Sequence, residues 1–227
     1  VYAIENGMRL FFDVREGQKT GFFYDHRDNR ERLAEWAAQH AEQRRDRGGL
    51  RALDCFSYVG SWGLGIAARH RSYQVTCVDT SQAALDFVLR NAEANGLRDR
   101  VQVIKADLFK DKDLLKGEGF DVVVSDPPAL SSSAKDAGAS LRGHEKCFSM
   151  ALAWLKPDGL AALAACSFHM TTDEFLEVCR AAGQSEQRAL QFLSVTGQSA
   201  DHPILAALPE TRYLKCALVQ DLNGWQA

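Results

Sequence analysis

Two short segments carry residue types suited to covalent chemistry on a planar substrate. Residues 165–170 read Ala-Cys-Ser-Phe-His-Met and residues 126–128 read Asp-Pro-Pro, each directly after an apolar run. A thiolate that adds to carbon 6 of a pyrimidine turns the ring into an enamine, which makes carbon 5 nucleophilic. Cys166 is therefore the candidate nucleophile, and Asp126 is the candidate group that holds or protonates the ring. The alternative is that Cys166 is a buried strand residue, as free cysteines often are.

Acidic residues also follow the earlier apolar runs. Four aspartates stand at the ends of successive runs: Asp54, Asp79, Asp107 and Asp126. Ligands of open α/β sheets bind beyond the carboxyl ends of the strands, so these side chains would face one site. Asp79 could accept hydrogen bonds from both hydroxyls of a ribose, and Asp107 from an adenine amine. The alternative is that these acids cap helices for structural reasons.

The glycines after the first run do not suit a dinucleotide. Gly60, Gly63 and Gly65 have the order GxxGxG, whereas a pyrophosphate site needs GxGxxG before a helix. A cofactor without phosphate, but with a ribose, an adenine and an amino-acid tail, fits better. The sequence therefore predicts S-adenosylmethionine, with the turn at Gly60 admitting the tail.

The composition is that of an ordinary globular protein. The 227 residues are 46% hydrophobic and 25% charged, which excludes disordered, collagen-like and coiled-coil chains. The net charge of −3 does not by itself indicate a nucleic-acid binder. No apolar run approaches the roughly 18 residues of a membrane span, and no signal peptide is visible, so we expect a cytoplasmic chain. The cysteines are scattered without a CxxC, so neither a metal site nor disulfides are expected.

The elements that must position these residues follow from the apolar patterns. Residues 2–14 predict a hairpin with an Asn-Gly turn at 6–7, residues 17–29 a loop, and residues 30–47 a helix ended by Gly48-Gly49. Further strands are predicted at 51–56, 74–79, 101–106, 120–125, 159–166, 188–196 and 211–220. Further helices are predicted at 62–69, 81–95, 144–155 and 172–182.

This alternation predicts an α/β fold with a mostly parallel, seven-stranded sheet and helices on both faces. The last two strands would form an antiparallel pair at one edge. The small, polar residues 131–140 predict a mobile loop beside the site. We expect a hairpin and cofactor-covering loop over residues 1–29 and the main domain over 30–227.

Several motifs resemble the bacterial large-subunit (23S) ribosomal RNA cytosine-5 methyltransferase family. They are GQKTGFFYDHRDNR (17–30), LDCFSYVG (53–60), VDTSQAAL (78–85), ADLFK (106–110), FDVVVSDPPAL (120–130), ACSFHM (165–170), DHPIL (201–205) and PETRYLK (209–215). The resemblance implies a class I, Rossmann-like methyltransferase domain that uses S-adenosylmethionine and releases S-adenosylhomocysteine. It also implies a nucleophilic cysteine at Cys166, and an RNA-binding PUA domain upstream of Val1 that this chain lacks.

The motifs and the resemblance together give a set of candidate site residues. The catalytic candidates are Cys166 and Asp126. The cofactor-binding candidates are Lys19, Thr20, Phe22, Asp54, Phe56, Ser57, Tyr58, Gly60, Asp79, Thr80, Ser81, Asn91, Asp107, Leu108, Asp126 and Pro127. The substrate-binding candidates are Arg27, Pro128, His169 and His202. The group that removes the proton from carbon 5 stays unassigned, and the residues 143–148 depart from the Gly-Tyr-Lys pattern of the family.

The leading hypothesis is an RNA methyltransferase that forms 5-methylcytosine in large-subunit ribosomal RNA. One alternative is methyl transfer to another base or ribose atom, with Asp126 as the key group. Another is a non-catalytic module that binds the cofactor or RNA. RNA is the expected partner, no membrane partner is expected, and homodimer formation is left open.

Overall fold

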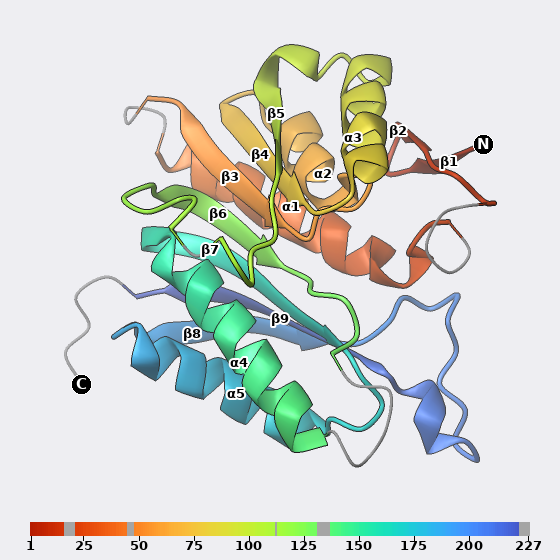
Figure 1. Cartoon of the computed structure of the whole chain (residues 1–227), viewed down its shortest axis with the longest axis vertical. Helices are drawn as coiled ribbons and strands as arrows, with labels where there is room; N and C mark the ends of the chain where they lie inside the picture. The colour runs from red at the N-terminus through yellow and green to blue at the C-terminus, as the bar shows by residue number, and fades with distance from the viewer. Residues whose placement is uncertain (16–20, 45–47, 112, 131–136, 223–227) are drawn as a thin grey trace. The chain divides into compact units, whose positions relative to one another are not determined.

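The computed structural model describes residues 1–15, 21–44, 48–111, 113–130 and 137–222 (Figure 1). The chain divides into two compact units, which are Val1–Asp111 and Lys112–Ala227. Lys19 and Thr20, two of the predicted cofactor-binding residues, lie outside the described residues.

Unit 1 contains three parallel strands in the order β5-β4-β3. They are β3 (Leu50–Cys55), β4 (Tyr73–Asp79) and β5 (Val101–Lys105). Its helices are α1 (Arg27–Glu42), α2 (Ser61–Arg69) and α3 (Gln82–Ala94), with short 3-10 turns η1 (Tyr24–His26) and η3 (Arg98–Arg100). The side chains of β3 and β4 are mostly buried on both faces, which explains why their sequences are nearly continuous apolar runs.

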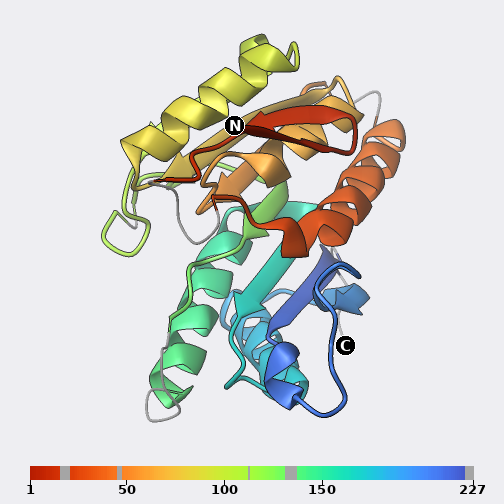
Figure 2. The same ribbon diagram turned by 90° about the vertical axis from the view of Figure 1, so that its right-hand side faces the viewer.

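The predicted hairpin is present at the start of unit 1. Strands β1 (Tyr2–Glu5) and β2 (Met8–Phe11) pair antiparallel around Asn6 and Gly7, whose positive φ angles of 50° and 79° are those of a primed turn. The hairpin contacts α2 and α3 (Figure 2). By its contacts it therefore belongs to the first compact unit.

Unit 2 contains four strands in the order β6-β7-β9-β8. They are β6 (Phe120–Ser125), β7 (Leu155–Cys166), β8 (Leu190–Thr196) and β9 (Leu214–Asp221). Strand β7 is parallel to β6, and β9 runs antiparallel to both of its neighbours. The helices α4 (Ala137–Ala153) and α5 (Thr172–Ser185) pack on each other, and η5 (Pro209–Thr211) precedes β9.

The two units hold three and four of the seven strands, so the predicted α/β class with a mostly parallel seven-stranded sheet is confirmed. The antiparallel pair near the end of the chain is also confirmed. Strand β7 begins at Leu155, before the predicted start at 159, and α5 extends to Ser185, beyond the predicted end at 182. Two other helices differ more from their predictions. Helix α1 ends at Glu42, before Gly48-Gly49, and α4 begins at Ala137, so residues 137–140 of the predicted loop are helical.

The early start of α4 has a tertiary cause. The backbone carbonyl of Ser140 is 2.8 Å from Nδ1 of His144, one turn later, and both side chains are buried. Gly138 and Ser140 are weaker helix formers than alanine, so the local helical signal is mixed and burial of this turn decides its conformation. Residues 131–136 of the predicted loop lie outside the described residues.

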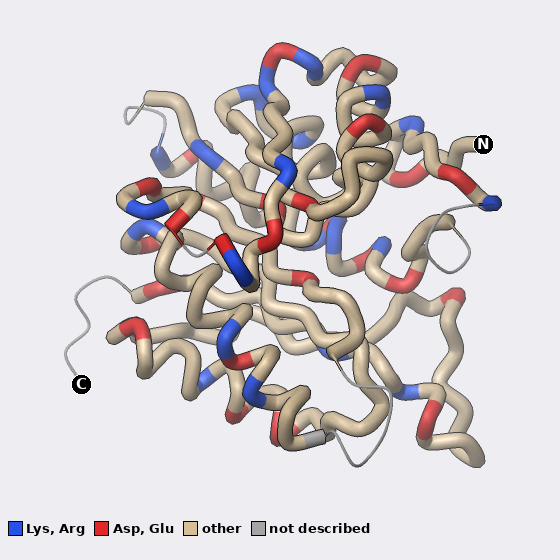
Figure 3. The backbone as a smooth tube through the Cα atoms, in the orientation of Figure 1, with Lys and Arg blue, Asp and Glu red and all other residues tan. Residues whose placement is uncertain are grey.

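Charged residues of both signs are interspersed along the described chain (Figure 3). Within the described residues, every helix is too short or too polar to cross a membrane. The same part of the chain contains no group of three or more His, Cys, Asp or Glu side chains placed to hold a metal ion.

Candidate functional site

The carboxylate of Asp79 is fixed by backbone groups from two loops of unit 1. The Tyr58 N–H donates to Oδ2 at 2.8 Å, and the Ser81 N–H donates to Oδ1 at 2.9 Å. Asp79 ends β4 and is half-buried. A carboxylate has about four acceptor sites, so both oxygens retain capacity for a further donor. The side chain is therefore oriented in advance, with room for ligand hydroxyls.

The loop after β3 has an unusual backbone. Phe56 and Tyr58 have positive φ angles of 61° and 48°, and Gly60 has 82°. The loop is tied to the end of β4, because the Ser57 N–H donates to the Val78 carbonyl at 3.0 Å. Non-glycine residues in this conformation cost free energy and concentrate at functional sites. The loop that carries four predicted cofactor-binding residues is therefore held in one specific shape.

The glycines of this segment serve turning and packing. At Gly60, which precedes α2, a Cβ would lie 3.0 Å from a methyl of Val88, so the space is filled by the core. At Gly63 a Cβ would lie 2.7 Å from a methyl of Val75. These glycines let α2 pack closely on the sheet of unit 1 and α3, which is a structural reason for the GxxGxG order.

Asp107 follows β5 and is also half-buried. Its Oδ1 accepts from the Phe109 N–H at 3.0 Å, and Oδ2 pairs with the exposed Lys110 ammonium at 2.9 Å. The Lys110 ammonium and the Phe109 amide hold the pKa of Asp107 below its usual value. The carboxyl is thus an acceptor at neutral pH. The Phe109 ring lies 5.7 Å from that of Phe56, which joins this turn to the loop after β3.

Residues 21–24 lie against the same loop. The Tyr58 hydroxyl donates to the Gly21 carbonyl at 2.9 Å, and the Phe23 ring packs edge-on against Tyr58 at 5.5 Å. Phe22 is buried and packs on Phe12 and Tyr24, with ring centroids 5.2 and 4.9 Å away. Phe22 is therefore part of the packing that anchors this segment.

Four predicted cofactor-binding side chains are used by the fold itself, namely Asn91, Asp54, Leu108 and Ser81. Asn91 is fully buried, and its amide donates to the carbonyls of Phe11 and Val59, so it clamps the hairpin and cannot reach a cofactor. Asp54 is buried and accepts from the Gly63 N–H at 2.8 Å, which secures the start of α2.

The side chain of Leu108 lies in the core, so only its backbone could meet a ligand. Thr80 is exposed. The Ser81 hydroxyl caps α3 by accepting from the Ala84 N–H at 3.2 Å.

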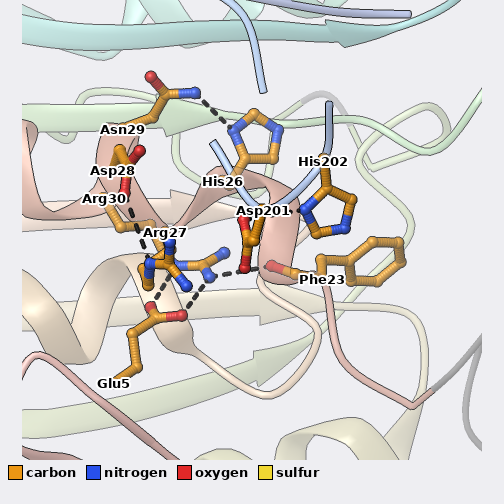
Figure 4. Close-up of polar contacts among 9 residues, drawn as sticks. All are labelled: Glu5, Phe23, His26, Arg27, Asp28, Asn29, Arg30, Asp201 and His202. Carbon is orange, nitrogen blue, oxygen red and sulfur yellow. Dashed lines mark hydrogen bonds and ion pairs between the residues drawn. The ribbon is translucent and has the colours of Figure 1, made fainter. Parts of the chain in front are cut away.

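A buried ion pair joins the hairpin to α1. The Arg30 guanidinium makes two hydrogen bonds of 2.6 Å to the Glu5 carboxylate, and a third of 2.9 Å to the Phe23 carbonyl (Figure 4). A cavity in unit 1 lies beside this pair. Its walls are Glu5, Asn6, Met8, Arg30, Glu31, Ala34, Ser61, Gly65, Ala68 and Arg69. None of the predicted site residues lines it.

In unit 2, Cys166 and Asp126 lie at the carboxyl ends of neighbouring parallel strands. Cys166 ends β7 and Asp126 follows β6 directly. Asp126 is half-buried, Pro127 is buried and Pro128 is exposed. Cys166 is half-exposed, whereas the other five cysteines of the chain are buried. Burial raises the pKa of Cys147 to about 12, so that thiol is inert at neutral pH. Cys166 is the accessible thiol of the chain.

Two residues near Cys166 were not predicted from the sequence. Phe168 is 46% exposed although it is aromatic, and its ring lies 5.3 Å from that of the exposed His169. Lys215, in β9, is only 4% exposed, and its ammonium donates to the Ser167 carbonyl at 2.6 Å. A lysine inside the otherwise apolar run 214–219 was the available signal for the second residue.

The remaining substrate candidates lie on polar segments. In unit 1, the Arg27 guanidinium is 3.4 Å from the Asp28 carboxylate. In unit 2, Nδ1 of His202 is 3.1 Å from the Asp201 carboxylate, and both side chains are partly exposed (Figure 4). These contacts leave both side chains at the surface of their unit.

The fold is that of methyltransferases that use S-adenosylmethionine. The chain superposes with a TM-score of 0.79 on a solved structure titled "A putative sam-dependent methyltransferase from Streptococcus mutans", with 22% identity, covering 97% of this chain and 55% of that one. A methyltransferase of the same cofactor class from Agrobacterium tumefaciens gives 0.64 and 19% identity, covering 98% of this chain and 69% of that one. The profile of the family Conserved hypothetical protein 95 matches residues 28–190, and the chain belongs to that family.

Curated relatives have a more specific name. The protein called Ribosomal RNA large subunit methyltransferase I is 37% identical over 222 residues in Aeromonas salmonicida, covering 95% of this chain and 52% of the relative. The protein of the same name in Klebsiella pneumoniae is 37% identical over 217 residues, covering 93% and 51%. The chain thus spans about half the length of the curated relatives it matches.

These findings correct the family assignment made from the motifs. The family shown is Conserved hypothetical protein 95, whose description names no base and no reacting atom. The names of the relatives specify ribosomal RNA but not cytosine or carbon 5. The assignment to a cytosine-5 family, with its absent upstream domain, was therefore wrong as a statement of family.

Proposed function

We propose that this chain is the methyl-transferring part of an enzyme that modifies large-subunit ribosomal RNA and forms 5-methylcytosine through Cys166. The observation that carries the proposal is the accessible Cys166 thiol at the end of β7, beside the β6 end that precedes Asp126. The name of the relatives supports ribosomal RNA as the substrate. A cytoplasmic location follows from that substrate, and a homodimer stays a prediction.

The proposed cofactor is S-adenosylmethionine, which supplies the methyl group when bound. Asp79 suits its ribose, because two backbone N–H groups orient the carboxylate while acceptor capacity remains. Asp107 suits the adenine amine, because its pKa is lowered and it is ionised at neutral pH. The loop 56–60, with its positive φ angles, would admit the amino-acid tail by its backbone. A solved structural neighbour bound to S-adenosylhomocysteine supports this choice.

The proposed chemistry begins when the Cys166 thiolate adds to carbon 6 of cytosine. A new C–S bond forms and the 5,6 double bond of the ring breaks. Asp126 would hold the ring in place or protonate it while the adduct forms. Carbon 5 would then accept the methyl group of the cofactor, and the methyl–sulfur bond of the cofactor breaks to leave S-adenosylhomocysteine. Loss of the carbon 5 proton to a base restores the 5,6 double bond and breaks the C–S bond, which returns the thiolate.

Exposed groups near Cys166 suit an RNA base. Phe168 and His169 follow the nucleophile and present ring surfaces to solvent. Stacking of a base on an aromatic side chain contributes about 1–3 kcal/mol. Pro128 is exposed in the segment after Asp126. Together with Arg27 and His202, these residues are the proposed substrate contacts.

The test is product analysis with ribosomal RNA from cells that lack the gene. The purified protein is given this RNA and S-adenosylmethionine, and the RNA is then digested and its nucleosides are identified by mass spectrometry. The proposal expects 5-methylcytidine, its loss in Cys166→Ala, and its retention in the control Cys216→Ala, which alters a buried cysteine of β9. Formation of a different methylated nucleoside would show that the methyl group goes to another atom and would contradict the carbon 5 chemistry. Cofactor binding without any methylated nucleoside would indicate a binding module.

A further inference from the structure

One face of the hairpin in unit 1 carries exposed aromatic and aliphatic side chains. In the β1–β2 register, Tyr2 lies opposite Phe11 and Ile4 lies opposite Arg9. Because side chains alternate along a strand, these four share one face, and the other face is mostly buried in unit 1. Tyr2 is 52% exposed and Ile4 is 72% exposed. Large exposed side chains gathered in this way are typical of an interaction surface.

Two arginines cover the aromatic rings of this face. The guanidinium carbon of Arg9 lies 5.2 Å from the centre of the Tyr2 ring. That of Arg90, from α3, lies 4.0 Å from the centre of the Phe11 ring, and the two ring centres are 5.4 Å apart. These four side chains form one continuous row, which we call the hairpin row. A guanidinium that stacks on a ring keeps the N–H groups at its edge available to an acceptor.

Neither arginine of the hairpin row is neutralised by a carboxylate. Within the described ranges of the chain, no ion pair involves Arg9 or Arg90. Asp86, one turn before Arg90 in α3, accepts instead from a glutamine side chain at 3.0 Å. An exposed arginine elsewhere in unit 1 does pair, since Arg69 lies 3.0 Å from the Glu35 carboxylate. The hairpin row therefore presents two positive charges that suit an anionic ligand.

The hairpin row is held in place by two asparagines of α3. Asn91 accepts from the Phe11 N–H at 2.6 Å and donates to the Phe11 carbonyl at 3.1 Å. Asn95 makes the same two contacts with the backbone of Arg9, at 2.9 and 2.8 Å. Strand β2 is thereby fixed along α3 (Figure 1). A surface that is ordered in advance loses less entropy when it binds a flexible chain.

We propose that the hairpin row binds a single-stranded segment of the RNA substrate. A base stacks on the exposed Tyr2 ring, and the guanidinium edges of Arg9 and Arg90 contact the phosphates beside it. Rings combined with cations are typical of sites for single-stranded nucleic acid, whereas a duplex hides the faces of its bases. This inference rests on the proposed function, in which RNA is the substrate, and it adds a substrate contact in unit 1.

The test is binding of fluorescein-labelled oligouridine, measured by fluorescence anisotropy without cofactor at several salt concentrations. Each phosphate contact with a single strand contributes about −0.7 to the slope of log K against log salt. The double variant Arg9→Gln, Arg90→Gln should therefore reduce the size of the slope by about 1.4 and weaken binding about 25-fold at about 0.1 M salt. Arg69→Gln removes an arginine that is already paired with Glu35, and this control should bind as wild type.

Tyr2→Leu separates stacking from charge. Loss of the ring should weaken binding about 5- to 150-fold, the range for a base stacked on an aromatic side chain, and should leave the salt slope unchanged. If the double variant does not fold, each single arginine variant should reduce the size of the slope by about 0.7.

Unchanged affinity in either the folded double variant or folded Tyr2→Leu would overturn the proposal, as would wild-type protein that does not bind oligouridine. Unchanged affinity in both variants would favour a protein as the partner of this face. Weakened binding in both variants, together with no methylated nucleoside in the product analysis, would contradict the proposed function but support the hairpin row as an RNA site.

Discussion

The candidate site residues of the two units are held in different ways. In unit 1, Asp79 is oriented by the backbone of the loops that follow β3 and β4. In unit 2, the Lys215 ammonium donates to the Ser167 carbonyl across the β7–β9 strand pair, and the two residues are 48 positions apart in the sequence. The proposed cofactor site in unit 1 thus depends on loop shape at strand ends. The segment after the proposed nucleophile in unit 2 depends instead on the register between β7 and the antiparallel strand β9. Substitutions in the two units should therefore impair different properties of the protein.

The largest stability effect is expected at the buried ion pair of unit 1. Arg30→Met leaves the Glu5 carboxylate buried without its partner, since both side chains are 2% exposed. The free energy of unfolding should fall by about 3–5 kcal/mol. Chemical denaturation measures it. The matched control is Glu35→Gln, which breaks the exposed Arg69–Glu35 pair and should cost less than about 1 kcal/mol. Equal losses in the two variants would show that the hairpin is not anchored by this pair.

The next effect concerns the proposed cofactor site of unit 1 alone. Asp79→Asn removes the charge that would accept from the ribose, and a hydrogen bond to a charged group contributes about 1.5–3 kcal/mol. We expect the dissociation constant for S-adenosylmethionine to rise about 10- to 100-fold, measured by titration calorimetry. The rate at which iodoacetamide alkylates Cys166 in the absence of cofactor should not change. Asp86→Asn, on the exposed face of α3, is the control and should bind as wild type. Unchanged affinity in folded Asp79→Asn would remove Asp79 from the site.

The smallest effect is a pH dependence of stability from unit 2. Burial lowers the pKa of His144, although the Ser140 carbonyl and the Asp126 charge act in the opposite direction. The unfolded chain then binds the proton more readily, so stability is complete above about pH 6.5 and is lost as the pH falls below it. The loss is at most about 1.4 kcal/mol per pH unit.

Urea denaturation at pH 7.5 and pH 5.5 measures this dependence. His144→Phe fills the same buried position without a titratable group, and it should lose less stability between the two pH values than wild type. An equal loss in both proteins would assign the pH dependence to other groups.

Much of the structure of unit 1 could be predicted from local sequence. The strands are short apolar runs, and the Asn6-Gly7 turn has one typical geometry. Acidic residues at the ends of strands indicate the edge of the sheet where a ligand would bind. What the sequence could not give is which acids face a ligand. Asp54 and Asp79 stand at the ends of neighbouring strands, yet Asp54 is buried against Gly63. The two aspartates differ because α2 packs closely against Asp54, and this tertiary contact cannot be predicted from local sequence.

Unit 2 shows the same limit over longer distances. Cys166 and Asp126 were found because each follows an apolar run. The contact of Lys215 with the Ser167 carbonyl was not predicted, because it depends on β9 pairing with β7, and no local pattern fixes that register. The start of α4 at Ala137 was not predicted for a similar reason. Ser140 is buried, and the local sequence does not predict that burial.

The central claim is that Cys166 forms a transient bond to carbon 6 of a cytosine in RNA. Ribosomal RNA that contains 5-fluorocytidine tests it most directly, because fluorine at carbon 5 cannot leave as a proton and the adduct is trapped after methyl transfer. With S-adenosylmethionine present, we expect a denaturation-resistant complex of protein and RNA whose linked peptide contains Cys166, and no complex with Cys166→Ala. A complex linked through another residue, or 5-methylcytidine formed by Cys166→Ala, would contradict the account.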